Sequence, residues 1–102
     1  MEMIPKIAFG EVFCWWPPRT SVRRTCTIND GQGRIRRIDI YVSKIALMDA
    51  SRSTSTPSNE ELEAMAKRLW DKRIYPVVKQ RIMDGQFAPD GTLQVTTAEI
   101  GR

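Results

Sequence analysis

A hairpin signal dominates the first half of the sequence: Asp-Gly-Gln-Gly at 30–33 lies between alternating apolar and polar segments at 22–28 and 34–42. A two-residue loop would put the apolar residues of the two segments on opposite faces of a sheet. A three-residue loop with a left-handed Gly33 shifts the pairing by one residue and brings them to one face. Because a slip of one residue moves a whole apolar set into water, we expect the second register. The inner face then holds Val22, Cys26, Ile28, Ile38, Ile40 and Val42.

The same register makes Arg24 the misfit of the hairpin. Arg24 falls on the inner, apolar face, and we expect it near an edge, where its stem can be buried and its charged head solvated. The outer face carries polar, charged and aromatic residues, namely Arg23, Thr25, Thr27, Arg37, Asp39 and Tyr41.

Further strands and a short helix flank the hairpin. The β-forming residues of 7–16 predict a first strand that ends at the two prolines of 17–18. Ser43 can cap a short helix over 44–50. A final strand is expected over 92–97, after an Asp-Gly turn.

The main helix begins at a capping box, Ser58-x-x-Glu61. Pro76 would cost roughly 3 kcal/mol in a helix interior, so we expect a kink or break near Tyr75 and a second helical segment that ends at Gly85. The buried stripe of the first segment is read from helical spacing as Leu62, Met65, Ala66 and Leu69.

The predicted elements follow the order β-β-β-α-α-β, which indicates an α+β fold. We expect a small antiparallel sheet, the β-hairpin plus additional strands, with helices packed on one face. A length of 102 residues fits one α+β domain, 1–102. A chain this short buries only about two-thirds of its unfolded surface, so a homodimer or a larger protein partner is a reasonable expectation.

Two blocks of the sequence resemble one protein family. Residues 33–47 read Gly-x-Ile…Ile-x-Ile-Tyr-Val-Ser…Ala-Leu before a capped helix, and residues 84–97 read Asp-Gly-Gln-Phe-Ala-Pro-Asp-Gly-Thr-Leu-Gln-Val-Thr-Thr. Over residues 21–100 the chain resembles the small bacterial proteins of the domain of unknown function 1488 family. The aromatic segment that precedes this range, residues 13–18, departs from the sequence pattern of the family. The resemblance implies an α+β fold and a bacterial origin, with no activity or catalytic residue to transfer.

Catalytic chemistry finds little support in the residue types. The chain has no histidine, the commonest general base and metal ligand. Cys14 and Cys26 cannot complete a tetrahedral zinc site, and both fall in apolar strand patterns that are typical of buried thiols. Gly31 and Gly33 belong to a hairpin turn, not to a phosphate-binding loop. We therefore predict no enzymatic activity, no catalytic residue, no metal and no cofactor.

The positive charge of the chain is concentrated in the hairpin region. Between Arg19 and Arg37 there are six arginines and one acid, Asp30. Such a surface can bind nucleic acid through phosphate, or it can protect a sheet edge from aggregation. The candidate residues for contact with an anion or with nucleic acid are Arg23, Arg34, Arg36 and Arg37.

Two adjacent tryptophans, Trp15 and Trp16, precede the rigid Pro-Pro turn and are the candidates for an apolar interface. On a strand, one ring would face the core and the other would face outward. The favoured function is therefore a non-catalytic protein-interaction or self-assembling module, with nucleic-acid binding through the arginine-rich hairpin as the alternative.

The location follows from what the sequence lacks. No stretch approaches the roughly 18–20 apolar residues that cross a bilayer, so no membrane association is expected. The first residues, 1–6, do not have the layout of a signal peptide. We expect a cytoplasmic protein.

Overall fold

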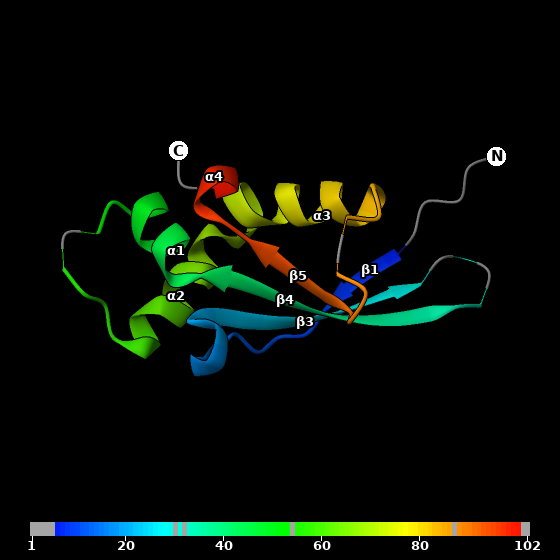
Figure 1. Cartoon of the computed structure of the whole chain (residues 1–102), viewed down its shortest axis with the longest axis horizontal. Helices are drawn as coiled ribbons and strands as arrows, with labels where there is room; N and C mark the ends of the chain where they lie inside the picture. The colour runs from blue at the N-terminus through cyan, green and yellow to red at the C-terminus, as the bar shows by residue number, and fades with distance from the viewer. Residues whose placement is uncertain (1–5, 30, 32, 54, 87, 101–102) are drawn as a thin grey trace.

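The computed structural model describes residues 6–29, 31, 33–53, 55–86 and 88–100. They form an elongated α+β molecule, 48 × 24 × 22 Å, built on one five-stranded sheet (Figure 1). The strands are β1 (Lys6–Phe9), β2 (Cys14–Trp16), β3 (Ser21–Asn29), β4 (Ile35–Ser43) and β5 (Thr92–Val95).

The strand order is β1-β3-β4-β5, and β2 also pairs with β3. The α+β class is confirmed, but the sheet is mixed, because β5 runs parallel to β4. All other pairs are antiparallel, as expected. The parallel pair arises because the helices between β4 and β5 form a crossover connection, which returns the chain in the same direction. The sequence pattern of the last strand carries no information on its direction.

The predicted hairpin register is confirmed. Val22 lies opposite Val42 and Cys26 lies opposite Ile38, so the apolar residues of both strands share one face. Gly33 has a positive φ of 85°, as a left-handed loop residue requires. Two residues of the predicted loop, Asp30 and Gln32, lie outside the described residues.

The predicted first strand is divided in two. β1 and β2 both pair with β3, and the chain between them leaves the ladder after Gly10, whose N–H donates to Thr25 O at 2.9 Å. A Cβ atom on Gly10 would lie 2.5 Å from Thr25 Oγ1, so a larger residue at this position would force the Thr25 side chain to move. The interruption lets the segment after Gly10 fold over the inner face of β3, where Phe13 packs against the core.

The first two helices begin where the capping residues predict. α1 (Lys44–Ala50) is capped by Ser43, whose hydroxyl accepts a hydrogen bond from Ala46 N at 3.1 Å. α2 (Asn59–Leu69) begins with the complete capping box.

Loss of the α2 cap gives a first testable stability change. Glu61 N donates to Ser58 Oγ at 3.2 Å, and Ser58 N donates to Glu61 Oε1 at 3.4 Å. We expect Ser58→Ala to lower the free energy of unfolding by about 1 kcal/mol in chemical denaturation, because Glu61 N loses the hydroxyl that accepts its hydrogen bond. Ser58→Asp should retain most of the stability, since its carboxylate can accept the same bond. Equal losses in the two variants would contradict the role of the cap.

Pro76 produces a widened turn and not a break. The helix continues from α2 through a π-helical turn, η2 (Trp70–Ile74), into α3 (Tyr75–Met83). Tyr75 N donates to Trp70 O, five residues back, and Pro76 then stands at the start of α3, where it needs no donor. The wider turn avoids the clash that Pro76 would make with the carbonyl four residues before it. The irregularity predicted near Tyr75 is therefore present as a widened turn, and the helix does not break there.

The C-terminal part follows the predicted pattern and adds one short helix. Gly85 has a φ of 68°, as a C-terminal cap requires, and β5 places Leu93 and Val95 inward. The chain then forms α4 (Thr97–Ile100), which the sequence did not indicate, and Ile100 is buried.

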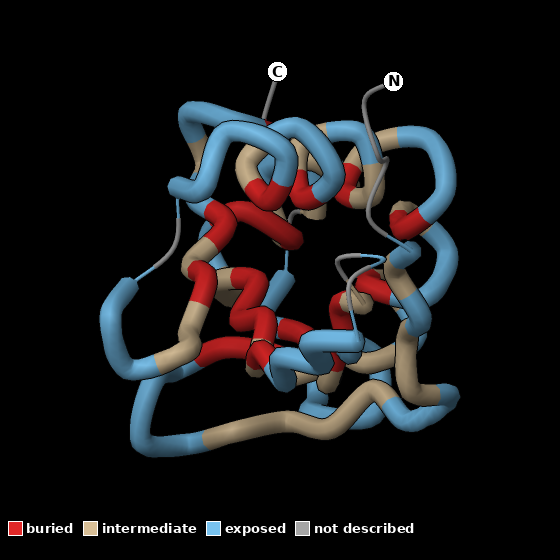
Figure 2. Tube along the Cα trace, turned by 90° about the vertical axis from the view of Figure 1, so that its right-hand side faces the viewer, coloured by how far each residue is buried: buried red, intermediate tan, exposed pale blue. Residues whose placement is uncertain are grey.

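The core lies between the inner face of the sheet and the helices (Figure 2). All four helices and the π turn contribute to the same buried cluster as β3, β4 and β5, so helices on one face of the sheet are confirmed. The outer face of β3 and β4 bears the six residues that the register predicts. The largest fully buried side chains are Ile38, Ile40, Leu47, Leu62, Ile74, Leu93 and Ile100.

Candidate functional site

The structure does not gather the four predicted arginines into one surface. Arg23 and Arg37 share the outer face but lie at opposite ends of the β3–β4 ladder, and Asp39 lies on that face between them. Arg36 is paired with Ile28, so it belongs to the other face. Arg34 precedes β4 beside the loop, and its side chain is exposed. The arginines therefore surround the hairpin rather than forming one compact patch.

The two tryptophans face opposite sides of the sheet, as expected for a strand. Trp15 packs against the core, and its backbone N–H donates to Glu63 Oε2 at 2.7 Å, which joins β2 to α2. Trp16 lies on the outer face, where the Arg23 guanidinium stands 4.1 Å from the centroid of its ring. Both tryptophans are half-buried, and the outward ring is partly covered by an arginine.

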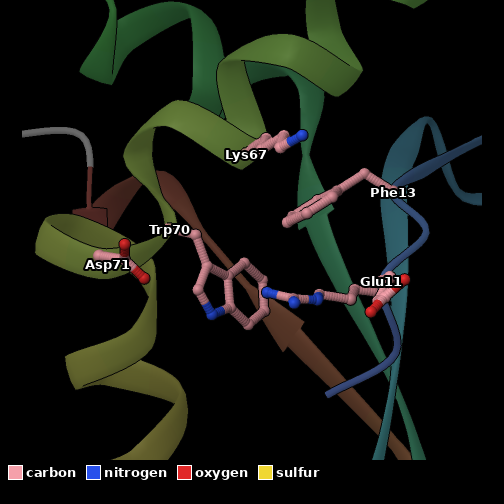
Figure 3. A pocket seen from close by; sticks show the side chains of 6 residues that line it. Glu11, Phe13, Lys67, Trp70 and Asp71 are labelled. Atoms are coloured by element: carbon pink, nitrogen blue, oxygen red, sulfur yellow. The ribbon is translucent and has the colours of Figure 1, made fainter.

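A cavity of about 520 Å³ lies between the start of the sheet and the helix, at a place that neither candidate set includes. Its base is formed by Phe13 and Trp70 together with Arg24 from the inner face of β3. Three exposed charged side chains surround this base, as Figure 3 shows: Glu11, Lys67 and Asp71.

Elements far apart in the sequence position these residues. Glu11 and Phe13 come from the segment that leaves the ladder after Gly10, and Lys67 comes from the last turn of α2. Trp70 and Asp71 occupy the start of the π turn (Figure 3). π-Helical turns are rare in proteins, and those that do occur often lie at functional sites. Here the widened turn that Pro76 requires also sets the positions of two residues of the cavity.

Arg24 lies in a cage of aromatic rings. Its guanidinium carbon is 4.4 Å from the ring centroid of Phe13, 4.5 Å from that of Trp70 and 5.0 Å from that of Phe9. Its Nε donates to Gly10 O at 2.7 Å. These contacts fix the guanidinium plane, and its two terminal nitrogens have no hydrogen-bond acceptor among the described residues, so their donors can serve another partner.

Within the described part of the chain, no ion pair neutralises the charge of Arg24. Burial lowers the pKa of the Arg24 guanidinium, and the negative charge of Asp71 partly opposes this effect. No ion pair among the described residues includes Arg24. A partly desolvated cation without a paired anion is electrostatically unfavourable, and a bound anion would compensate it.

A second cavity offers a useful contrast. It has a similar volume, about 540 Å³, and is lined in part by Arg81 and Glu99. There Arg81 is fully engaged, because its Nη1 donates to Gln94 O and lies 3.4 Å from Glu99 Oε1. Of these two cavities, the one at Arg24 combines hollow space with a cation that has no paired carboxylate among the described residues.

The indole of Trp70 adds a second group without a partner. Trp70 is 3% exposed, and its Nε1 is buried without a hydrogen-bond acceptor among the described residues. Its ring meets those of Phe9 and Phe13 edge to face, with centroids 5.1 and 5.6 Å apart. The aromatic cluster therefore packs closely around the arginine, in the way expected of a preformed site.

Comparison with known proteins gives one informative match. No family model matches the sequence, and no curated protein matches it. A solved structure does match: a protein of unknown function from the domain of unknown function 1488 family of Shewanella loihica PV-4, with a TM-score of 0.68 and 21% sequence identity. The match covers 87% of this chain and 90% of that one. This chain has the fold of the domain of unknown function 1488 family. The predicted resemblance is thus confirmed at the level of the fold.

Neither a membrane-spanning helix nor a metal-binding cluster is found among the described residues. No helix within the described ranges is long and apolar enough to cross a membrane. The described residues also contain no group of three or more His, Cys, Asp or Glu side chains that could hold a metal ion.

Sequence reasoning recognised Arg24 as a misfit but did not place it in a site. It expected a solvated head at the sheet edge, whereas aromatic rings surround the head. The sequence feature that could have indicated this site is an arginine on an apolar strand face that follows a strand rich in aromatic residues. Phe9 and Phe13 precede Arg24 in the chain, but their approach to Trp70 depends on the fold.

Cys14 and Cys26 are both free thiols. Cys14 is half-buried, whereas Cys26 is buried. Burial raises the pKa of the Cys26 thiol to about 11, so it is protonated at neutral pH, and its side chain is 1% exposed. We expect iodoacetamide to modify Cys14 in the native protein and to leave Cys26 intact, because the thiolate is the reactive form. Mass spectrometry of digested protein measures both sites. Equal rates of modification would contradict this assignment, and Cys14→Ser provides the control.

Proposed function

We propose that this chain is a member of the domain of unknown function 1488 family and a non-catalytic binding protein, whose cavity at Arg24 takes up an anionic group of its ligand. The observation that carries this proposal is the caged Arg24 guanidinium, which is partly desolvated and has no ion pair among the described residues. An arginine fixed in this way presents a planar pair of donors to a carboxylate.

The shape of the cavity supports a small ligand. Its volume of about 520 Å³ falls within the roughly 300–1,000 Å³ of small-molecule sites. The half-buried Phe13 supplies apolar surface beside the cation, and the buried Trp70 closes the base of the cavity, so the ligand should join an anionic group to an apolar body. The lack of histidine in the sequence and of a metal-binding cluster in the described residues supports binding without catalysis.

Hydrocinnamate, a phenyl ring on a short chain that ends in a carboxylate, is a suitable probe. We expect calorimetric titration to detect its binding, and its neutral amide, hydrocinnamamide, to bind at least about 10-fold more weakly. A hydrogen bond to a charged group contributes about 1.5–3 kcal/mol, which corresponds to roughly 10- to 100-fold in affinity. Equal affinities for the acid and the amide, or no binding of either, would overturn the proposal.

The matched pair of variants is Arg24→Met and Arg23→Met. The two arginines are adjacent on β3 and both stand over aromatic rings, but they face opposite sides of the sheet. Arg24→Met should reduce hydrocinnamate affinity by roughly 10- to 100-fold, whereas Arg23→Met should leave it unchanged. Methionine retains an apolar stem among the rings, so both variants should fold, which circular dichroism verifies. Equal losses in both variants would contradict a site at Arg24.

A protein-interaction or self-assembling module has less support than the pocket. Among the described residues, the large apolar side chains with the greatest exposure lie on four separate segments, at Val12, Ile35, Ile45 and Met83. Dispersed apolar residues of this kind are normal on a monomer surface. If the protein does self-associate, Trp16 is the residue to test, because its ring faces outward.

Nucleic-acid binding is a second candidate, and the outer face of the sheet favours it. Arg23 stands over Trp16, and Arg19 stands 4.3 Å from the ring centroid of Tyr41. Arginine and aromatic side chains together bind single strands through phosphate contacts and stacking. Binding of a single-stranded oligonucleotide that weakens steeply with salt, and that Arg23→Met and Arg37→Met both reduce, would support this function. Binding that neither variant changes would exclude the outer face.

A further inference from the structure

The cavity at Arg24 is lined by side chains of both charges. This combination restricts the class of ligand more than the requirement for an anionic group does. Arg24 and Lys67 are cationic, and Glu11 and Asp71 are anionic. A ligand with only a negative charge would gain from the two cations but would be repelled by the two carboxylates. A ligand that carries both charges close together can place its negative charge at a cation and its positive charge near one of the carboxylates.

The positions of the two carboxylates indicate where a positive charge would lie. Asp71 is close enough for its charge to act on the pKa of Arg24, although the two form no ion pair. In Figure 3, Asp71 and Glu11 lie on opposite sides of Trp70, with Lys67 beside the cavity from α2. An ammonium group next to a carboxylate bound at Arg24 would therefore lie within the field of Asp71.

The aromatic residues suit the remaining part of such a ligand. Phe13 and Trp70 both line the cavity, and their rings meet edge to face with centroids 5.6 Å apart. An aromatic ring of the ligand can pack against the half-buried Phe13, and an ammonium group is itself attracted to a ring face. The volume of about 520 Å³ leaves room for one amino acid with a ring-bearing side chain.

We infer that the ligand of this cavity is a zwitterion, namely a free amino acid with an aromatic side chain, with its carboxylate on Arg24 and its ammonium group toward Asp71. The inference rests on the proposed function, because it requires Arg24 to bind an anion. It adds the second charge and the aromatic side chain. A peptide does not fit equally well, because its two charged termini are separated by the chain.

Three related compounds test each charge in turn. L-phenylalanine carries both groups, L-phenylalaninamide lacks the carboxylate, and hydrocinnamate lacks the ammonium group. In calorimetric titrations we expect L-phenylalanine to bind roughly 10-fold or more tightly than either partner compound. If hydrocinnamate binds as tightly as L-phenylalanine, the zwitterion inference fails and anion binding stands. If none of the three binds, both proposals fail.

Variants of the acidic residues locate the ammonium group. Asp71→Asn should weaken L-phenylalanine binding by roughly 10-fold and leave hydrocinnamate binding unchanged or stronger. Asp49→Asn, an exposed acid on α1 outside the cavity, is the matched control and should change neither affinity. An equal loss for both compounds in Asp71→Asn would show a structural effect and would overturn the assignment of Asp71.

Discussion

Replacing Trp70 with alanine is expected to lower the free energy of unfolding by about 3–5 kcal/mol. Trp70 is 3% exposed and its ring contacts those of Phe9 and Phe13, as well as the guanidinium of Arg24. Removing it leaves a void where the first strand, the π turn and the cavity meet. For a domain of this size the loss is a large part of a total stability of roughly 5–15 kcal/mol. Chemical denaturation followed by far-ultraviolet circular dichroism measures it.

A second tryptophan provides the control for this effect. Trp16→Ala removes a half-buried ring on the outer face, so we expect a loss of less than about half that of Trp70→Ala. Trp70→Phe should recover part of the stability because it retains ring packing. If Trp16→Ala were as destabilising as Trp70→Ala, the assignment of Trp70 to the core would be wrong.

Replacing Ile40 with alanine is the second change with a large expected effect, a loss of about 2–5 kcal/mol. Ile40 has no exposed surface and lies at the centre of the sheet, opposite Arg24 on β3 and Leu93 on β5. The cavity left by its side chain would loosen both the antiparallel pair and the parallel pair. Denaturant unfolding, with an unchanged slope, would measure the loss as a change in midpoint.

Two further variants provide the scale against which the stability loss in Ile40→Ala is judged. Ile40→Val removes one methylene group and should cost about 0.5–1.5 kcal/mol. Thr27→Ala, at an exposed position of β3, should stay within about 0.5 kcal/mol of the unchanged protein. A loss in Ile40→Ala no greater than that in Thr27→Ala would contradict the central position of Ile40.

The candidate site was accessible from the sequence only in part. The hairpin register identified Arg24 as the one charged residue on the inner face of β3, but nothing local indicated which side chains would surround it. Phe13 and Trp70 are 57 positions apart in the chain, and their rings meet only because the segment after Gly10 folds over β3. The arginines selected by density along the chain are divided between two faces, because alternate residues of a strand point in opposite directions.

Local physical chemistry determined what the sequence could predict alone. The apolar alternation of β3 and β4 specified their register, Ser43 and Ser58 marked the helix starts, and Pro76 marked an irregular turn. The helix starts and the irregular turn depend on residues close together in the sequence, and the strand register depends on the alternation of apolar and polar residues. Tertiary structure decided the parallel direction of β5, the division of the first strand, and the π-helical form of the turn. It also decided the cage around Arg24, because these features arise from contacts between segments whose relative positions no local pattern encodes.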